Sequence, residues 1–344
     1  MMTQKINEPR RINAIIYWLY ACCALVFMMI IVGAITRLTE SGLSMVEWRP
    51  LIGALPPLNE EEWTRVYELY KQSPEFEKKH FWMGLEDFKN IFFWEWFHRF
   101  LGRLIGLVYG LPFLFFLLKG WIPSGYKLKL FGIFILGGLQ GLMGWYMVKS
   151  GLVDIPSVSH YRLTAHLSLA LLIYALMFWI AQNFKDLKTG TTRTGHFCLY
   201  RQSWVTLGLL MITIFWGAYV AGLDGGLVYN DSFPMMGDSF IPSEVWFYKP
   251  VWVNFFEHPA GVQFVHRWLA MFTGLAILAL SVRAMRTGYI QLRFALLGFF
   301  VFVQIGLGIA TLLSGVNIAL AVMHQGGAVI LLTLLLACMY KLRV

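Results

Sequence analysis

Residues 95–118, EWFHRFLGRLIGLVYGLPFLFFLL, place an acid and a histidine at the start of a long apolar run. About 20 mostly apolar residues are enough for one helix to cross the hydrocarbon of a bilayer. Polar side chains at the mouth of such a helix are costly and usually functional. A second stretch, QFVHR at residues 263–267, opens a later apolar segment with the same His-Arg pair. Together they predict a bundle of membrane helices that carries histidines.

The composition of the whole chain agrees with a membrane protein. Of its 344 residues, 58% are hydrophobic and 14% are charged, which is too apolar for a single water-soluble core. Eight segments have the length of membrane helices, not of the short alternating strands of a barrel. They are residues 14–36, 95–118, 128–148, 161–182, 203–223, 261–282, 291–313 and 319–340. The fold class expected is therefore an all-α integral membrane protein with eight transmembrane helices.

Basic residues predict the orientation of these helices. With eight spans both ends of the chain lie on the same side of the membrane. The segments on that side are rich in Lys and Arg, and their only acidic residues are Glu8 and Asp186. The positive-inside rule makes this side the cytoplasm. Charge beside anionic lipid explains the net charge of +9 without a nucleic-acid partner. The first span has no cleavage site or transit sequence before it, so a retained anchor in a bacterial cytoplasmic (inner) membrane is expected.

Two outer loops are long. In the first, about residues 38–94, Asn59 and Glu62 have the spacing of a helix N-cap and its third residue. An apolar stripe follows at helical spacing, formed by Trp63, Val66, Tyr67 and Tyr70. This pattern predicts a short helix that lies on the membrane face or caps the bundle. The other loop, about residues 224–260, is rich in Gly and Pro and is expected to be mostly irregular.

An internal repeat relates the two halves of the chain. The matched features keep the same order and are Gly33-Ala34 to Leu43 with Gly217-Ala218 to Leu227, His98-Arg99 with His266-Arg267, Gln140 to Ser150 with Gln304 to Ser314, and His166 with His324. Each half, residues 1–190 and 191–344, then holds four helices. An even number of spans per repeat predicts two four-helix bundles in the same orientation, related by a pseudo-twofold axis along the membrane normal.

Four histidines recur at corresponding places in this repeat. We expect each within the first turn or two of an even-numbered span, at one depth near the outer face: His98, His166, His266 and His324. A single histidine in a bundle is more often a packing residue, but four at one depth favour ligation of iron or another metal. Haem is favoured over zinc, because each site offers two nitrogens and zinc usually takes three or four protein ligands.

Other polar residues near these positions have two readings. Arg99, Arg103 and Arg267 could bind haem propionates, or they could only extend their charged ends to the membrane surface. The loop histidines, His80, His196 and His258, are expected to have surface roles.

The two halves differ at one position beside the first histidine. Glu95 lies one helical turn before His98, whereas Gln263 stands before His266. A carboxylate at one site alone could act as a general base or position a water next to a bound porphyrin. The alternative is a Glu95 that is solvated or paired with Arg99.

Several motifs resemble the haem A synthase family. They are residues 33–44 (GAITRLTESGLS), Glu95-x-x-His98-Arg99 with Gly102-Arg103, and the four repeated histidines. The resemblance implies that haem o is the substrate and that a haem b is the resident cofactor. It also implies that the C8 methyl of haem o is hydroxylated twice and that the geminal diol loses water to give the formyl group of haem A.

The same resemblance assigns roles residue by residue. It makes His98 and His166 the substrate-haem pair, Glu95 the acid needed for catalysis, and His266 and His324 the ligands of haem b. Another branch of the family carries a cysteine pair after the Ser-Gly-Leu motif. This chain has none there, and in this it resembles the branch that includes the mitochondrial proteins. The expected partners are a haem o synthase and proteins of cytochrome oxidase assembly. The other readings are a non-catalytic dihaem b cytochrome for electron transfer and a haem carrier or chaperone.

Overall fold

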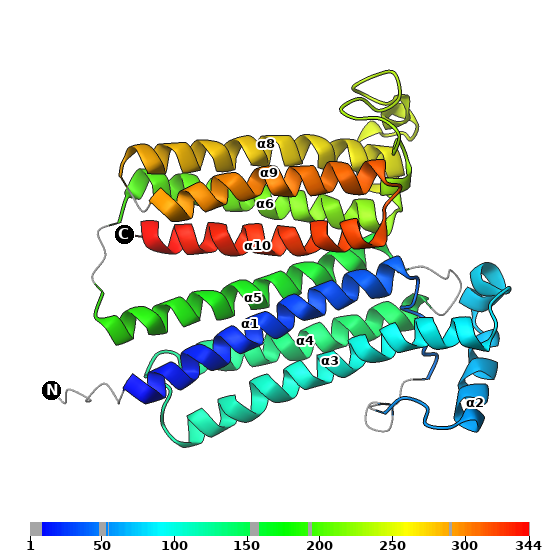
Figure 1. Cartoon of the computed structure of the whole chain (residues 1–344), viewed down its shortest axis with the longest axis horizontal. Coiled ribbons are helices and arrows are strands. Elements are labelled where there is room, and N and C mark those ends of the chain that lie inside the picture. The colour runs from blue at the N-terminus through cyan, green and yellow to red at the C-terminus, as the bar shows by residue number, and fades with distance from the viewer. Residues whose placement is uncertain are drawn as a thin grey trace. The chain divides into compact units, whose positions relative to one another are not determined.

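The computed structural model describes residues 9–47, 53, 55–151, 158–191, 195–288 and 291–343. Eight helices in this part of the chain are long and apolar enough to cross a membrane (Figure 1). They are α1 (Pro9–Leu38), α3 (Leu85–Leu118), α4 (Lys127–Gly151), α5 (His160–Thr189), α6 (Phe197–Gly222), α8 (Pro259–Arg286), α9 (Gln291–Leu313) and α10 (Ile318–Leu342). Each overlaps one of the eight segments expected from hydropathy, so the all-α membrane class is confirmed.

The remaining elements are short and lie in the two long loops that the sequence analysis expects on the outer side. They are α2 (Glu60–Lys71) and the π-helix η2 (Phe76–His80) in the first loop, and η3 (Gly225–Leu227), η4 (Ser243–Trp246), η5 (Val251–Val253) and α7 (Asn254–Glu257) in the other. The second of these loops holds only single turns of helix, as its Gly and Pro content predicts.

The chain divides into two compact units. The first comprises Met1–Arg162 with Leu169–Thr189, and the second comprises Leu163–Ser168 with Gly190–Val344. In the second unit α6 packs on α8, α8 on α9, α9 on α10 and α10 on α6, so these four helices close into a bundle (Figure 1). Side chains of this bundle such as Leu280, Leu297 and Leu335 are fully buried.

In the first unit α1 packs on α3, and α3 packs on α4. Trp18 of α1 joins the first pair, because its indole ring lies 4.9 Å from the ring of Tyr109 and 5.5 Å from that of Phe116, centroid to centroid. Its Nε1 donates a hydrogen bond of 2.8 Å to the carbonyl oxygen of Val108. The indole therefore satisfies its polar atom while its rings fill the contact between helices.

The predicted loop helix is present and covers an extension of α3. The side chain of Asn59 accepts a hydrogen bond of 2.8 Å from the backbone N–H of Glu62, which confirms the N-cap. The apolar stripe of α2 packs against Phe88, Ile91 and Phe92 at the start of α3, with Tyr70 at the centre of the cluster.

This extension changes the place of His98 in its helix. α3 begins at Leu85, not at residue 95. Charged residues such as Asp87 and Lys89 hid this extension from the hydropathy pattern. Its apolar residues Phe88, Ile91 and Phe92 are buried in the cluster with α2. His98 therefore lies more than three turns inside α3, at about 3.6 residues per turn. The expectation that it lies in the first two turns is wrong.

Candidate functional site

Two of the repeated histidines face each other in the second unit. His266 of α8 and His324 of α10 have ring centroids 6.5 Å apart, with ring planes inclined at 83°. Two imidazoles bound to opposite sides of one iron, each with its nitrogen about 2 Å from the metal, have centroids about 6 Å apart. The separation of these two rings therefore fits a bis-histidine haem.

Glycines make room for both rings. A Cβ added to Gly217 of α6 would lie 3.0 Å from Cε1 of His266, and one added to Gly308 of α9 would lie 2.8 Å from Cε1 of His324. A contact of 2.8 Å is closer than real side chains show and one of 3.0 Å is unusually tight, so each ring would have to shift to admit a Cβ at its glycine. Gly217 belongs to the repeated Gly-Ala motif, but the sequence alone did not assign it to His266.

Hydrogen bonds orient the same two rings. Nδ1 of His266 lies 3.0 Å from the carbonyl oxygen of Thr213. This oxygen only accepts, so in the neutral ring Nδ1 carries the proton and Nε2 keeps its lone pair. The side-chain amide of Gln304 lies 3.2 Å from Nδ1 of His324 and donates to the carbonyl oxygen of His324 at 2.9 Å. The second nitrogen of a ligating histidine typically donates, as Nδ1 of His266 does. The amide nitrogen of Gln304 can only donate, so Nδ1 of His324 accepts in this contact.

The first unit repeats the glycine and histidine packing. A Cβ added to Gly33 of α1 would lie 3.1 Å from Cε1 of His98, and Gly33 and His98 are the repeat partners of Gly217 and His266. Nδ1 of His98 is buried and has no hydrogen-bond partner among the described residues. His166 lies in Leu163–Ser168, which groups with the second unit. The pairing of His98 with His166 stays a prediction.

Glu95 is held by donors from the first outer loop and from its own helix. Its side chain is 3% exposed. Oε2 accepts hydrogen bonds of 2.7 Å from the hydroxyl of Ser44 and from the backbone N–H of Met45. Oε1 accepts a bond of 2.5 Å from Nη2 of Arg99. The alternative in which Glu95 pairs with Arg99 is thus confirmed. The carboxylate also connects the loop to α3 through its bonds to Ser44 and Met45.

Gln263 makes the corresponding contact with the opposite polarity. Its Nε2 donates to the carbonyl oxygens of Gly225 at 2.8 Å and Val228 at 2.5 Å. Val228 follows Gly217 at the same spacing as Ser44 follows Gly33. The loop of the first unit offers donors and requires a carboxylate, whereas the loop of the second unit offers acceptors and requires an amide. Part of the Glu95 and Gln263 difference is therefore a difference in loop attachment.

The arginines after the histidines hold the same loops. Nη2 of Arg99 donates to the carbonyl oxygen of Met45 at 3.1 Å, and Nη2 of Arg267 donates to that of Tyr229 at 2.9 Å. Met45 and Tyr229 are equivalent in the repeat. The Arg99 side chain is only 11% exposed, so it does more than extend its charge into the solvent.

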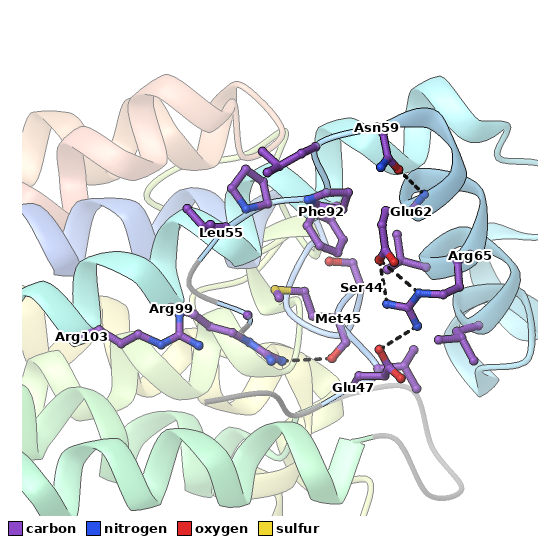
Figure 2. Close-up of a pocket in the computed structure, with 17 residues that line it drawn as sticks. Ser44, Met45, Glu47, Leu55, Asn59, Glu62, Arg65, Phe92, Arg99 and Arg103 are labelled. Atoms are coloured by element: carbon purple, nitrogen blue, oxygen red, sulfur yellow. Dashed lines mark hydrogen bonds and ion pairs between the residues drawn. The ribbon is translucent and has the colours of Figure 1, made fainter. Parts of the chain in front are cut away.

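A cavity lies beside Arg99 and Arg103 in the first unit. Its volume is about 310 Å³, and its wall also includes Leu55, Phe92 and Arg65 (Figure 2). Arg65 forms ion pairs with Glu47 at 3.0 Å and Glu62 at 3.1 Å. This size is at the lower limit of ligand pockets. The wall mixes apolar residues with these two glutamates and three arginines, and Arg99 and Arg103 are the arginines that come from α3.

One of the three loop histidines differs from the surface role expected of it. His80 is 5% exposed and bonds to Tyr70 and Glu40, so the expectation is wrong for this residue. Sequence polarity missed it because charged neighbours surround it. Nδ1 of His196 and of His258 accept backbone N–H groups and cap the first turns of α6 and α8.

Comparison with known proteins covers nearly the whole chain. The family model described as "Cytochrome oxidase assembly protein" matches residues 16–336. Haem A synthase of Rhodospirillum centenum is 49% identical over 334 residues, which cover 96% of this chain and 89% of the relative. Haem A synthase of Nitrosospira multiformis is 49% identical over 349 residues, which cover 99% and 97%. Haem A synthase of Agrobacterium fabrum is 43% identical over 336 residues, which cover 96% and 90%.

Proposed function

The chain belongs to the family of cytochrome oxidase assembly proteins, and from this premise we propose how its residues carry out the haem A synthase function of its relatives. The similarity extends over 96% to 99% of the chain at 49% identity. The chain is thus an oxidoreductase that acts on haem o and serves oxidase assembly. The facing imidazoles of His266 and His324 are the structural observation that best supports a haem protein.

The reaction proposed is oxidation of one methyl group. The C8 methyl of haem o is hydroxylated to a hydroxymethyl group and then to a geminal diol, and the diol loses water to leave the formyl group of haem A. A porphyrin with two propionates and an apolar tail must enter from the membrane or from another protein. An amphipathic cavity at the outer end of a helix bundle matches that requirement.

The second unit is the place proposed for a resident haem b. His266 and His324 would be its axial ligands, with Gly217 and Gly308 leaving space for the rings and Thr213 and Gln304 orienting them. When bound, such a haem supplies one-electron transfer. Arg267, one residue after His266, is the proposed partner of a propionate and already anchors the neighbouring loop.

The N-terminal half of the chain, residues 1–190, is the place proposed for the substrate. His98, with His166 as its predicted partner, would bind the iron of haem o, and Arg99 and Arg103 would bind its propionates at the cavity. Glu95 is the catalytic acid proposed. Three donors hold its carboxylate in one orientation, and a general base requires such fixed placement.

We place the protein in the bacterial cytoplasmic membrane. The bias of Lys and Arg toward one set of loops favours cytoplasmic N- and C-termini and sites near the outer face. A haem o synthase and subunits of cytochrome oxidase are the proposed partners, because haem o and haem A are poorly soluble and gain from direct transfer.

Pigment analysis tests the function directly. The chain is expressed in cells that make haem o but lack haem A, and the haems are extracted and separated by type. We expect haem A or its hydroxymethyl intermediate, and none in cells with the empty vector. Unchanged haem o with a bound bis-histidine haem b would instead identify an electron-transfer cytochrome.

A further inference from the structure

A chain of four polar side chains crosses the first outer loop. The hydroxyl of Tyr70 lies 3.1 Å from Oε2 of Glu75 and 2.7 Å from Nδ1 of His80. Nε2 of His80 lies 3.2 Å from Oε2 of Glu40. Tyr70 comes from α2, Glu75 and His80 from the segment around η2, and Glu40 from the turn after α1. Three separate elements thus converge on one hydrogen-bonded row.

The row runs from the interior to the surface. Tyr70, Glu75 and His80 are 0%, 4% and 5% exposed, whereas the Glu40 side chain is 51% exposed. Buried polar groups are costly unless they are hydrogen-bonded, and here every member is bonded to the next.

The donors and acceptors of the row allow two arrangements of its protons. Glu40 as a carboxylate only accepts, so Nε2 of His80 donates to it. In one arrangement Tyr70 donates to Nδ1 of His80, and a protonated Glu75 donates to Tyr70. In the other, Nδ1 of His80 donates to Tyr70, and Tyr70 donates to an ionised Glu75, which is the direction of this bond in the structure. The two states differ by one proton shifted from Glu75 through Tyr70 to His80.

The surrounding charges agree with a protonated inner end. Burial raises the pKa of Glu75 to about 8, and the negative charges of Glu95 and Glu40 also raise it. The hydrogen bond from Tyr70 and the positive charge of Lys79 lower this pKa, but by less. Burial also acts to raise the pKa of Glu40, but its bonds to Lys79 and His80 outweigh this and lower that pKa below the usual range. Burial and the charges of Glu75, Glu95 and Glu40 raise the pKa of Tyr70, so its hydroxyl keeps its proton.

The second unit has a different arrangement at the corresponding loop. Asp224 matches Glu40 in the repeat. A tyrosine and a glutamate also pair there, with the hydroxyl of Tyr229 donating to Glu244 at 2.7 Å. That bond lowers the pKa of Glu244, and the charge of His258 acts in the same direction. The acid of this pair is therefore shifted opposite to Glu75.

We propose that Glu75, Tyr70, His80 and Glu40 form a proton relay between the surface of the loop and the buried acid Glu75. One passage converts protonated Glu75 and ionised Glu40 into ionised Glu75 and protonated Glu40, with one O–H or N–H bond broken and one formed at each step. Glu40 then exchanges its proton with water. The use of the relay rests on the proposed function, because methyl oxidation beside Glu95 moves protons. The existence of the relay does not depend on that function.

Infrared titration tests the inner end without catalysis. Purified protein and the Glu75→Gln variant are compared in difference spectra between pH 5 and 10. We expect a protonated carboxyl band that is lost on Glu75→Gln and titrates near pH 8 in the parent protein. A Glu75 that is already ionised at pH 6 would overturn the relay, whether or not the protein makes haem A.

Matched tyrosine variants test the passage. Tyr70→Phe keeps the ring but removes the central hydroxyl. Tyr67→Phe is the control, because Tyr67 lies on the same helix and cluster and its hydroxyl donates to the carbonyl oxygen of Met83 at 2.6 Å, outside the row. Haem b content checks folding of both variants.

We expect Tyr70→Phe to slow haem o conversion about tenfold or more and to change its pH profile and solvent deuterium effect. Tyr67→Phe should change none of these. Equal pH profiles and isotope effects for Tyr70→Phe and the parent would overturn the relay. If the parent protein makes no haem A, the proposed function fails while the infrared result still decides the relay.

Discussion

Gly217 of α6 lies against the imidazole of His266 of α8, so closely that a methyl group on Gly217 would come within 3.0 Å of Cε1. Gly33 and His98 repeat this relationship in the first unit at 3.1 Å. At these distances the ring would have to shift by a few tenths of an ångström to admit a Cβ, so each glycine helps to place its histidine. The repeated Gly-Ala motif thus has a physical role that spacing alone did not reveal.

Gly217→Ala should displace the ring of His266 and weaken haem b. We expect the haem b content of the purified protein to fall several-fold and its bis-histidine absorption and electron paramagnetic resonance spectra to change. Gly208→Ala is the matched control on the same helix, because a Cβ there meets nothing within 4 Å. Equal haem b content in the two variants would show that His266 does not need this space.

Gln304→Leu should loosen His324. The substitution removes the amide contacts to Nδ1 and to the carbonyl oxygen of His324. Loss of such an orienting group typically lowers affinity by about 10- to 100-fold. Titration of haem b into the apoprotein measures the effect. Gln202→Leu is the control, because Gln202 is bonded to Arg283 on an exposed surface, and similar affinities for both variants would contradict the prediction.

Glu95→Gln should abolish haem o conversion and leave haem b bound. An amide can replace only part of the acceptor capacity that Ser44, Met45 and Arg99 use. Pigment analysis and the haem b spectrum are measured together, with Glu86→Gln as the control for loss of an exposed acid on the same helix.

Ser44→Ala separates the two roles of Glu95. It removes one bond to the carboxylate but keeps the acid, so conversion should fall by less than 100-fold if Glu95 acts chemically. If Ser44→Ala abolishes conversion as completely as Glu95→Gln, attachment of the loop would account for both losses.

Glu75 should make stability fall as pH rises. Its pKa is raised from 4.5 to about 8 in the folded protein, so between these values the folded state binds more protons than the unfolded state. The free energy of unfolding therefore decreases as pH increases through this window. Glu75→Gln should remove this part of the pH dependence.

Thermal unfolding of both proteins in detergent between pH 5 and 9 measures the difference. The Tm of Glu75→Gln should gain on that of the parent as pH rises toward 8, and Glu77→Gln, at an exposed neighbouring position, should follow the parent. Parallel Tm curves for Glu75→Gln and the parent would show that Glu75 titrates normally.

The eight membrane helices could be predicted from the sequence, because hydropathy over about 20 residues depends on composition and length and not on packing. The N-cap at Asn59 could also be predicted, since it depends on side chains three residues apart. The family followed from local motifs such as residues 33–44.

Other features depend on which backbone groups and side chains packing brings together. The start of α3 at Leu85 follows from burial against α2, and the buried row through His80 joins residues that are 5, 10 and 40 positions apart. The opposite polarity at Glu95 and Gln263 follows from the donors or acceptors that each loop presents. A sequence states which groups can donate or accept, but only the tertiary structure decides which partner each one meets.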